Sequence, residues 1–392
     1  MENEASYYNQ DFQANGVATV SIGHAIHDGY AAFLPALLPQ LIDKFALSNT
    51  AAGLLTVFYR LPFLVQPFIG WLADHANLRW MVILSPAITG AVMSFLDLVP
   101  SYGFILFLLL LAGISSATLH ATGPVISSAL SGKYLGRGMS FWMVGGELGR
   151  AMGPVIIVTA ITYLSVESVP WLMLGGVLTS IFLFFKLDGI STQTQHLIAP
   201  VDWRQSLKQL GQLMMFLGII SFLRYITMAS LTIYLPTFLT QEGSTLWMAG
   251  FSLTIFELAG IGGAFLAGVL SDKFGRRRML VVSSIATPIF MLIFLYANEW
   301  WKLPLLMLMG FFSLAAVPVL MAIAIENAKD QRAFANGLFM AVSLLAEALA
   351  VVLVGLFSDR FSFNLTFLVS AAAMPLTLPF VRMLPKSVKN RG

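Results

Sequence analysis

The chain has 392 residues, of which 58% are hydrophobic and only 10% are charged. Soluble domains carry about 45–50% apolar and about 25% charged residues, so this composition excludes an ordinary soluble protein and indicates a membrane protein with many spans. The absence of cysteine excludes disulfides and thiol chemistry, and the formal net charge of +3 is explained below by membrane orientation rather than by nucleic-acid binding.

Twelve stretches of the chain are apolar and long enough to cross a membrane, which takes about 20 residues in a helix. The predicted spans are residues 16–41, 50–73, 79–98, 102–131, 138–163, 169–186, 210–240, 246–270, 278–299, 302–326, 333–356 and 363–384. The stretch 187–209 is polar and lies near the middle of the chain. We therefore expect an all-α membrane protein with twelve transmembrane helices in two pseudo-symmetric six-helix bundles.

The expected domains follow from these spans. They are an N-terminal tail (1–15), a first bundle (16–186), a linker (187–209), a second bundle (210–384) and a C-terminal tail (385–392). The first fifteen residues contain no Lys or Arg, so they lack the basic region of a secretory signal and are predicted to be a cytoplasmic tail.

Lysine and arginine are distributed unevenly between the two sides of the membrane. With both termini inside, sixteen lie on the cytoplasmic side, three lie outside and three lie within the spans. This asymmetry follows the positive-inside rule. It predicts a multi-pass protein of the bacterial inner membrane with both termini in the cytoplasm.

Seven charged residues lie near the midpoints of their spans. A charge at the centre of a bilayer costs about 3 kcal/mol or more, so it persists mainly where it faces protein or a water-filled cavity. A belt of charges at one depth therefore suggests a polar chamber, as a secondary transporter needs. The belt consists of Asp28, Arg60, Glu147, Arg150, Arg224, Glu257 and Glu347.

A short motif recurs after corresponding spans of the two halves. GWLAD (Gly70–Asp74) follows the second span, GVLSD (Gly268–Asp272) follows the eighth at an offset of 198 residues, and GLFSD (Gly355–Asp359) ends the eleventh. An offset near half the chain length indicates an internal repeat, which is typical of transporter folds.

The longer segment GVLSDKFGRRRM (Gly268–Met279) resembles the cytoplasmic loop signature of the major facilitator superfamily. We interpret it as a gate latch in which arginines pair with a neighbouring helix in one conformation and release it in the other. In the first-half copy His75 and Asn77 replace the expected basic residue and glycine, which predicts a weaker latch. The predicted gating residues are Gly70, Asp74, Arg79, Gly268, Asp272, Gly275, Arg276, Arg277 and Glu326.

Within that superfamily the chain is most similar to the fosmidomycin-resistance group of drug exporters. The similarity rests on His24, His27 and Asp28 followed by LPALLP, on QPFIG (Gln66–Gly70), on His120, and on VGGELG (Val144–Gly149) with Gly153 and Pro154. The superfamily resemblance implies that the first, fourth, seventh and tenth spans line the transport cavity most directly. The resemblance to the group implies export in exchange for protons.

His24, His27 and Asp28 are spaced i, i+3 and i+4, so they share one face of a helix. A carboxylate beside imidazoles in a low-dielectric setting can titrate near neutral pH, which suits proton coupling. The alternative is a hydrogen-bonded network that only fixes helix packing.

Glu147 and Arg150 lie one turn apart on the fifth span. In the functional interpretation an anionic substrate takes Arg150, and Glu147 is then free to accept a proton. The alternative is an ion pair that merely neutralises a buried charge. We expect Asp28, Glu147, His24 and His27 to carry proton coupling.

Arg60 and Arg224 lie in opposite halves at similar depth, and guanidinium groups bind carboxylates and phosphonates through two parallel hydrogen bonds. They could clamp one anion, or instead pair with Glu257 or Glu347. His120 is expected to be a hydrogen bonder rather than a metal ligand. The predicted substrate-binding residues are Arg60, His120, Arg150, Arg224, Glu257, Glu347, Tyr30, Tyr59, Trp142 and Tyr225.

The sequence lacks a phosphate-binding loop, so ATP-driven transport by this chain is not expected. An intramembrane enzyme would need one reacting cluster, whereas the charged belt is spread over both halves, and a lipid flippase is a further alternative. We predict a transporter, not an enzyme, that works as a monomer with no cofactor or metal and with the proton as coupling ion. It would export a small anionic, zwitterionic or amphiphilic compound; the alternative is proton-coupled import of an organic acid, sugar acid or polycarboxylate siderophore.

Overall fold

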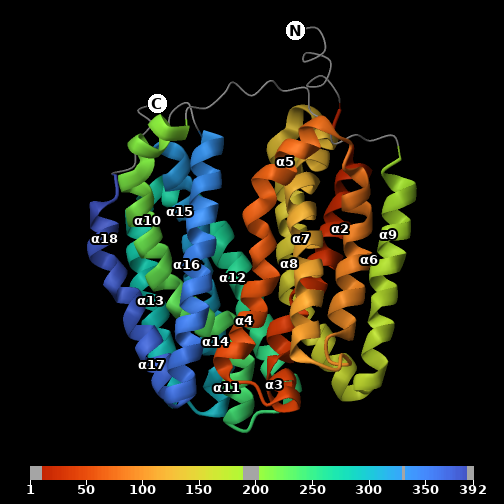
Figure 1. The fold of residues 1–392 in the computed structure, drawn as a ribbon. Helices are drawn as coiled ribbons and strands as arrows, with labels where there is room; N and C mark the ends of the chain where they lie inside the picture. The colour runs from red at the N-terminus through yellow and green to blue at the C-terminus, as the bar shows by residue number, and fades with distance from the viewer. Residues whose placement is uncertain (1–10, 189–202, 329–331, 386–392) are drawn as a thin grey trace. The chain divides into compact units, whose positions relative to one another are not determined.

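The computed structural model describes residues 11–188, 203–328 and 332–385, which form α-helices and short 3-10 helices (Figure 1). Within these ranges there is no strand, so the prediction of an all-α protein is confirmed. The predictions for most of the two tails and of the linker fall on residues 1–10, 189–202 and 386–392, which lie outside the described residues, as does the side chain of Asp74.

The chain forms two compact units. The first unit contains residues 1–45 and 55–197, and the second contains residues 46–54 and 198–392. Helices of the first unit are α2 (Ala14–Ala31), α3 (Phe33–Phe45), α5 (Gln66–His75), α6 (Arg79–Phe95), α7 (Tyr102–Ser131), α8 (Leu135–Tyr163) and α9 (Met173–Lys186), with 3-10 turns η1 (Leu61–Val65), η2 (Gly132–Tyr134) and η3 (Val166–Leu172).

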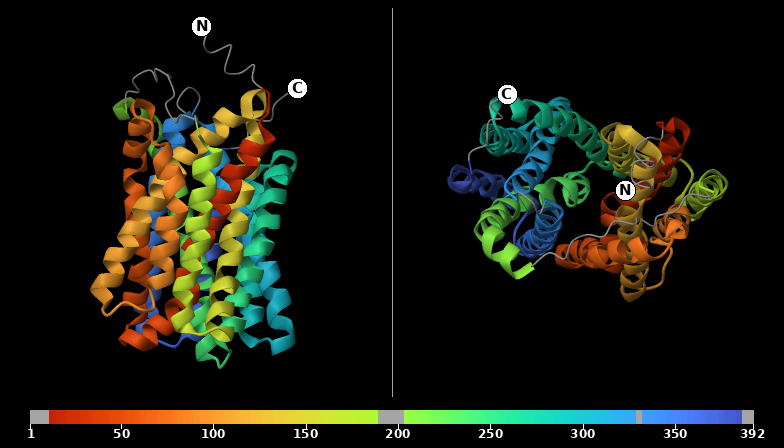
Figure 2. Two further views of the ribbon diagram at one scale, coloured as in Figure 1. Left: turned by 90° about the vertical axis from the view of Figure 1, so that its right-hand side faces the viewer. Right: turned by 90° about the horizontal axis from the view of Figure 1, so that it is seen from above.

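Helices of the second unit are α10 (Trp203–Thr232), α11 (Leu235–Gln241), α12 (Leu246–Phe274), α13 (Arg276–Tyr296), α14 (Glu299–Leu314), α15 (Ala316–Glu326), α16 (Arg332–Arg360), α17 (Phe363–Ala373) and α18 (Leu378–Met383), with the 3-10 turn η4 (Met374–Thr377). Helix α4 (Asn49–Arg60) begins in the second unit and ends in the first. Seen from above, the long helices appear nearly end-on, so their axes run roughly parallel within each unit (Figure 2).

Each of the twelve predicted spans overlaps a helix or a run of helices. Among the described residues, eight helical runs are long and apolar enough to cross a membrane, and the run Tyr102–Tyr163 contains two predicted spans. One boundary differs from expectation, because α10 begins at Trp203, inside the stretch predicted to be a polar linker. The residues that follow Pro200 include Arg, Gln, Leu and Lys, which are good helix formers, so polarity alone does not end the helix there.

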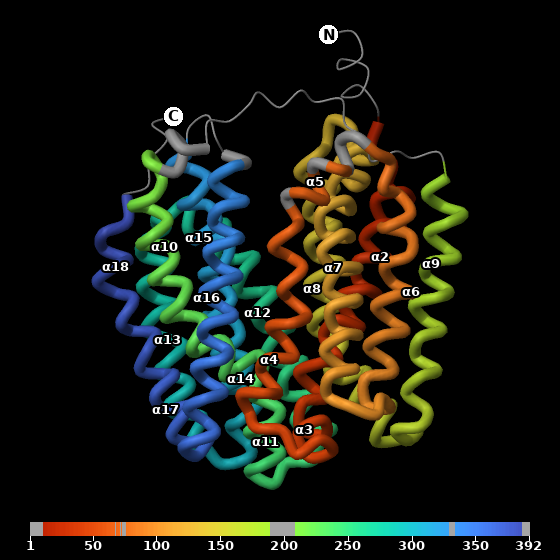
Figure 3. The backbone as a smooth tube through the Cα atoms, in the orientation of Figure 1, coloured from red at the N-terminus to blue at the C-terminus, as the bar shows by residue number. Residues whose placement is uncertain are grey.

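Prolines explain why three of the predicted spans are broken into two helices. Helices α2, α10 and α14 end at Ala31, Thr232 and Leu314, and each end lies four residues before a proline: Pro35, Pro236 and Pro318. A proline has no amide hydrogen to donate to the carbonyl four residues earlier, and its ring clashes with that carbonyl. Figure 3 shows the result in the second unit, where α15 lies above α14 as a separate segment.

Glycines let the helices of each unit approach closely. In the first unit α2 packs most extensively against α8, and a Cβ atom placed on Gly149 of α8 would lie 1.9 Å from the carbonyl oxygen of Ala25 on α2. In the second unit α12 packs against α14 in the same way, with Gly310 set against the carbonyl of Phe256. These contacts leave no room for any side chain.

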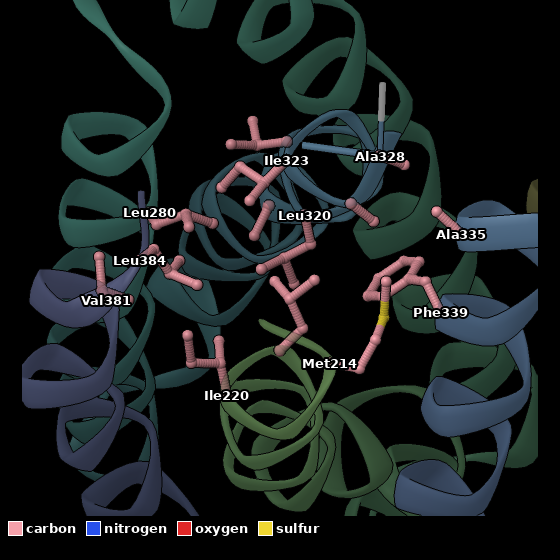
Figure 4. Close-up of a cluster of buried hydrophobic side chains, with 14 of the residues drawn as sticks. Met214, Ile220, Leu280, Leu320, Ile323, Ala328, Ala335, Phe339, Val381 and Leu384 are labelled. Atoms are coloured by element: carbon pink, nitrogen blue, oxygen red, sulfur yellow. The ribbon is translucent and has the colours of Figure 1, made fainter. Parts of the chain in front are cut away.

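A hydrophobic cluster fills the interior of the second unit (Figure 4). Its members come from distant parts of the chain, and they include Met214 of α10, Leu280 of α13, Leu320 of α15, Phe339 of α16 and Val381 of α18. These side chains are almost completely buried. The cluster therefore ties five helices together within one unit.

The third copy of the repeated motif holds the start of α4 within the second unit. The carboxylate of Asp359 accepts hydrogen bonds from the backbone amides of Asn49 (2.6 Å) and Thr50 (3.0 Å). A helix N-terminus has unpaired amides and a partial positive charge, so a carboxylate there is stabilising. Gly355 supports this contact, because a Cβ atom at that position would lie 2.8 Å from the Cα atom of Thr50.

We expect Gly149→Ala to lower the apparent melting temperature of the purified protein, because the new methyl group must push α8 away from α2. Overpacking of this kind costs about 1–3 kcal/mol. The matched control is Gly136→Ala on the same helix, where nothing lies within 4 Å of the added carbon. If both variants melt together with the parent protein, the close α2–α8 contact is wrong.

Candidate functional site

Three polar side chains meet in the interior of the first unit. The Nε2 atom of His24 lies 3.2 Å from Oδ2 of Asp28, which is one turn further along α2. The Nε2 atom of His120 on α7 lies 3.3 Å from Nε2 of His24 and 3.6 Å from Oδ1 of Asp28. His24 and Asp28 come together through the helix repeat, whereas His120 reaches them only through the packing of α7 against α2.

Backbone carbonyls determine which nitrogen of each imidazole carries the proton. Nδ1 of His24 lies 2.9 Å from the carbonyl oxygen of Trp142, and Nδ1 of His120 lies 2.9 Å from that of Ser116. A carbonyl oxygen only accepts hydrogen bonds, so each Nδ1 must donate. In the neutral rings both Nε2 atoms therefore present lone pairs to each other and to the carboxylate.

The surroundings hold the ring of His24 in place. It stacks on the indole of Trp142 with ring centroids 3.8 Å apart, and a Cβ atom on Gly146 would lie 2.3 Å from its Cε1 atom. His24 is almost completely buried, whereas the side chain of His120 is 29% exposed. The cluster therefore has one fixed histidine and one partly accessible histidine.

His27 lies outside this cluster, although the sequence grouped it with His24 and Asp28. It is completely buried and faces the backbone of Ser85 on α6. Its ring centroid lies 6.1 Å from that of His120. In the structure the third member of the cluster is therefore His120, not His27. The role of these residues in proton coupling stays a prediction.

Glu147 and Arg150 form the ion pair expected from their spacing on α8, through Oε2 and Nη2. Both side chains are partly exposed, at 31% and 39% respectively. The pair is therefore not sealed inside the protein core.

Arg224 of α10 is the most deeply buried of the arginines predicted to bind substrate, with 4% of its surface exposed. Its Nη2 atom donates to the carbonyl oxygen of Ser313 at 2.7 Å, in the last turn of α14, where helix carbonyls lack their usual amide partners. Its Nη1 atom is buried and has no hydrogen-bond partner. Among the described residues, no carboxylate forms an ion pair with this guanidinium.

The remaining residues predicted to bind substrate differ in how deeply they are buried. Glu257 is buried on α12, while Arg60, Glu347 and Tyr225 are partly buried on their helices. The hydroxyl of Tyr30 donates to the carbonyl of Leu172, and Tyr59 is buried beside α7. Tyr30 thus has a packing role between α2 and η3, and a direct contact with substrate is not needed to explain its position.

The loop signature places its first arginine in an ion network at the junction of α12 and α13. Nη2 of Arg276 lies 2.5 Å from Oδ1 of Asp272 and 2.6 Å from Oε1 of Glu326 on α15. Gly275 connects the two helices with a φ of 95°, in the left-handed region that favours glycine. In the first unit Arg79 pairs with Asp188 at 3.0 Å. The gating role of these residues stays a prediction.

Comparison with known proteins adds family information to this geometry. A sequence model described as the Major Facilitator Superfamily matches residues 20–264 and 217–392. The chain is 25% identical to the fosmidomycin resistance protein of Escherichia coli (strain K12), over 94% of this chain and 91% of the relative. It is 23% identical to the uncharacterized MFS-type transporter YfnC of Bacillus subtilis (strain 168), over 95% and 93% of the two chains.

Two solved structures have a similar fold. A bacterial homolog of the human lysosomal transporter Spinster, in an inward-facing and occupied conformation, superposes with a TM-score of 0.75 at 14% identity, covering 96% of each chain. The nucleoside transporter NupG gives a TM-score of 0.75 at 13% identity, covering 94% of this chain and 99% of that one. At these identities the likeness concerns the fold alone.

Nitrogen-15 NMR of histidine-labelled, metal-free protein at alkaline pH tests the arrangement of the cluster. We expect the resonances of His24 and His120 to report the tautomer protonated at Nδ1, because both Nδ1 atoms face carbonyl oxygens. His24→Gln and His120→Gln would assign the two signals among those of the five histidines. Protonation at Nε2 in either ring would contradict the geometry described above.

Proposed function

Because the chain belongs to the Major Facilitator Superfamily, we propose that it is a proton-coupled exporter of a small anionic or amphiphilic compound. Membership makes the chain a multi-pass membrane transporter of small molecules and not an enzyme. In the proposal it lies in the bacterial inner membrane with both termini in the cytoplasm, acts as a monomer, and works by alternating access of its two six-helix bundles.

The buried guanidinium of Arg224 is the observation that supports an anionic substrate. Burying a guanidinium is costly unless its donors find acceptors, and an ion buried without a partner is strongly destabilising. One carbonyl satisfies Nη2, while Nη1 has no partner. A carboxylate, phosphate or phosphonate group would supply both the missing acceptor and the opposite charge. The alternative, that Arg224 only fastens α10 to α14, leaves Nη1 unexplained.

Similarity to the fosmidomycin resistance protein supports export as the direction of transport. Fosmidomycin is a phosphonate, and a phosphonate is an anion of the kind that Arg224 would bind. We therefore choose fosmidomycin as the first probe compound. The sequence similarity extends along nearly the whole of both chains, so it includes both bundles.

The Glu147–Arg150 pair gives the proposal a route for coupling. In the described structure Arg150 is the ion-pair partner of Glu147. In the proposal a substrate anion takes Arg150, and Glu147 is then free to accept a proton. Substrate and proton are linked in this way without any further group.

Import of an anionic nutrient remains the second candidate, and the buried charge of Arg224 favours it as much as export. An organic acid, sugar acid or polycarboxylate siderophore would satisfy the same guanidinium. The direction of transport separates the two candidates, so a resistance assay decides between them.

Expression of the chain in a pump-deficient bacterial host is expected to raise resistance to fosmidomycin, and Arg224→Gln is expected to abolish the increase. Hydrogen bonds to charged groups contribute about 1.5–3 kcal/mol, so loss of this contact should lower affinity by about 10- to 150-fold. Arg224→Lys should retain part of the effect, because it keeps the charge but loses the forked geometry.

The matched control is Lys302→Gln, which removes a cation that pairs with the exposed Glu299 on α14. This variant should protect the host as well as the parent protein does, at equal amounts of protein in the membrane. Unchanged or increased susceptibility with the parent protein would overturn export and would direct the search to imported anions.

Glu147→Gln is expected to uncouple transport from the pH gradient, because the amide keeps the size of the side chain but cannot exchange a proton. In proteoliposomes with a gradient of one pH unit, one-for-one coupling gives at most about tenfold accumulation of substrate. The variant should equilibrate substrate without accumulating it, and Glu299→Gln should behave like the parent. Gradient-driven accumulation by the Glu147→Gln variant at the parental level would exclude Glu147 as the coupling group.

A further inference from the structure

The cluster of His24, Asp28 and His120 needs a positive charge at its centre. Both imidazole rings donate through Nδ1 to backbone carbonyls, so their Nε2 lone pairs face one another at 3.3 Å. The carboxylate of Asp28 faces the same point, and its Oδ1 atom is buried without a hydrogen-bond partner. Three acceptors that converge on one point repel each other unless a cation lies between them.

We propose that His24, Asp28 and His120 form a binding site for one divalent transition-metal ion of the zinc class. One ligand atom from each of the three residues can be chosen so that all lie within 4.8 Å of one another. The two Nε2 atoms are 3.3 Å apart, Nε2 of His24 lies 3.2 Å from Oδ2 of Asp28, and Nε2 of His120 lies 3.6 Å from Oδ1. Zinc bonds of about 2.0–2.2 Å in a tetrahedral arrangement place neighbouring ligand atoms about 3.3–3.6 Å apart. The two imidazole nitrogens are thus at the spacing of neighbouring zinc ligands, and each also has a carboxylate oxygen of Asp28 near that spacing.

The types of the donor atoms select the class of ion. Two imidazole nitrogens with one carboxylate oxygen suit Zn²⁺, Co²⁺ and Ni²⁺, whereas Mg²⁺ and Ca²⁺ prefer shells made of oxygen. Three protein ligands leave at least one coordination position open for water or for another ligand. This is the pattern of a reactive metal site, in contrast to a closed structural one.

The outer contacts of the cluster are those that metal-binding histidines require. A ligating histidine almost always donates its other ring nitrogen to a carbonyl or carboxylate, which fixes the tautomer and the ring orientation. The carbonyls of Trp142 and Ser116 provide this for His24 and His120. The stacked indole of Trp142 and the backbone at Gly146 hold His24 in its orientation.

An ion can reach the site from the side of His120, which is 29% exposed, whereas Asp28 is 14% exposed. Arg60 is close enough to act electrostatically on His120, and its positive charge opposes binding. Its guanidinium lies 5.8 Å from the ring centroid of Phe63, whose ring in turn neighbours that of His120. The net charge of the three ligands is −1 with neutral histidines, so the attraction for a dication remains.

The site lies wholly within the first unit, and its existence does not depend on the substrate or on the direction of transport. It replaces the sequence-based expectation that His120 is only a hydrogen bonder. The sequence showed that His24 and Asp28 share one face of a helix. It did not show the third ligand, His120, which lies 96 residues after His24 in the chain.

Titration of the purified full-length chain in detergent with Zn²⁺ or Co²⁺ tests the proposal. His75→Gln and His196→Gln are introduced first, so that these histidines do not contribute to binding. Calorimetry should give one Zn²⁺ per chain, and Co²⁺ should produce visible ligand-field bands of a four-coordinate site. Asp28→Asn and His120→Gln should each weaken binding by more than the about 10- to 100-fold that loss of an outer-shell partner costs.

Asp97→Asn is the matched control, because it removes a buried carboxylate of the same unit that is not one of the three ligands, and it should leave metal affinity unchanged. X-ray absorption of the Zn²⁺-loaded parent chain avoids any dependence on variant folding. It should show two imidazole nitrogens and a carboxylate oxygen at about 2.0–2.2 Å. Absence of stoichiometric binding, or binding that survives both ligand substitutions, would show that only protons occupy the cluster and would overturn the proposal. A failure of the fosmidomycin assay would leave this result untouched.

Discussion

The close approach of α2 and α8 is the contact on which the first unit depends. Gly149 has its Cα so near the carbonyl of Ala25 that no side chain fits between the two backbones. Between the same two helices, the carbonyl oxygen of Trp142 lies 2.9 Å from Nδ1 of His24. That hydrogen bond turns the Nε2 lone pair toward Asp28 and His120. The close packing of the α2 and α8 backbones is thus accompanied by a hydrogen bond that fixes the orientation of the His24 ring in the polar cluster.

Each unit contains a buried polar centre of opposite sign. In the first unit, three acceptors converge around Asp28. In the second unit, the guanidinium of Arg224 has a donor without an acceptor. Because lone buried charges are costly in a membrane, such centres persist where a ligand or ion satisfies them for part of the working cycle. In the two proposals, Arg224 of the second unit binds an anion and the cluster of the first unit binds a cation.

Much of the fold follows from the sequence, because a membrane forces its helices to be long and apolar, and each predicted span overlaps a helix. Contacts between residues on one helix also follow from the sequence: Glu147 and Arg150 pair as their spacing predicts. The presence of His120 instead of His27 in the cluster could not be predicted from the sequence. Spacing along α2 places both His24 and His27 near Asp28, and only the packing of α6 and α7 decides which imidazole reaches the carboxylate. The start of α10 at Trp203 differs from the predicted span because polar residues can continue a helix beyond the membrane.

The prolines that end α2, α10 and α14 have a mechanical consequence. These helices belong to the first, seventh and tenth predicted spans, which the superfamily resemblance predicts to line the transport cavity. A continuous helix transmits displacement along its whole length as a stiff rod, whereas a helix with a missing backbone hydrogen bond bends most easily at that point. Each of these three spans therefore consists of two helical segments joined at a point that bends easily. One half of such a span can tilt while the other half keeps its packing, so the proposed alternating-access cycle would have points of bending at Ala31, Thr232 and Leu314.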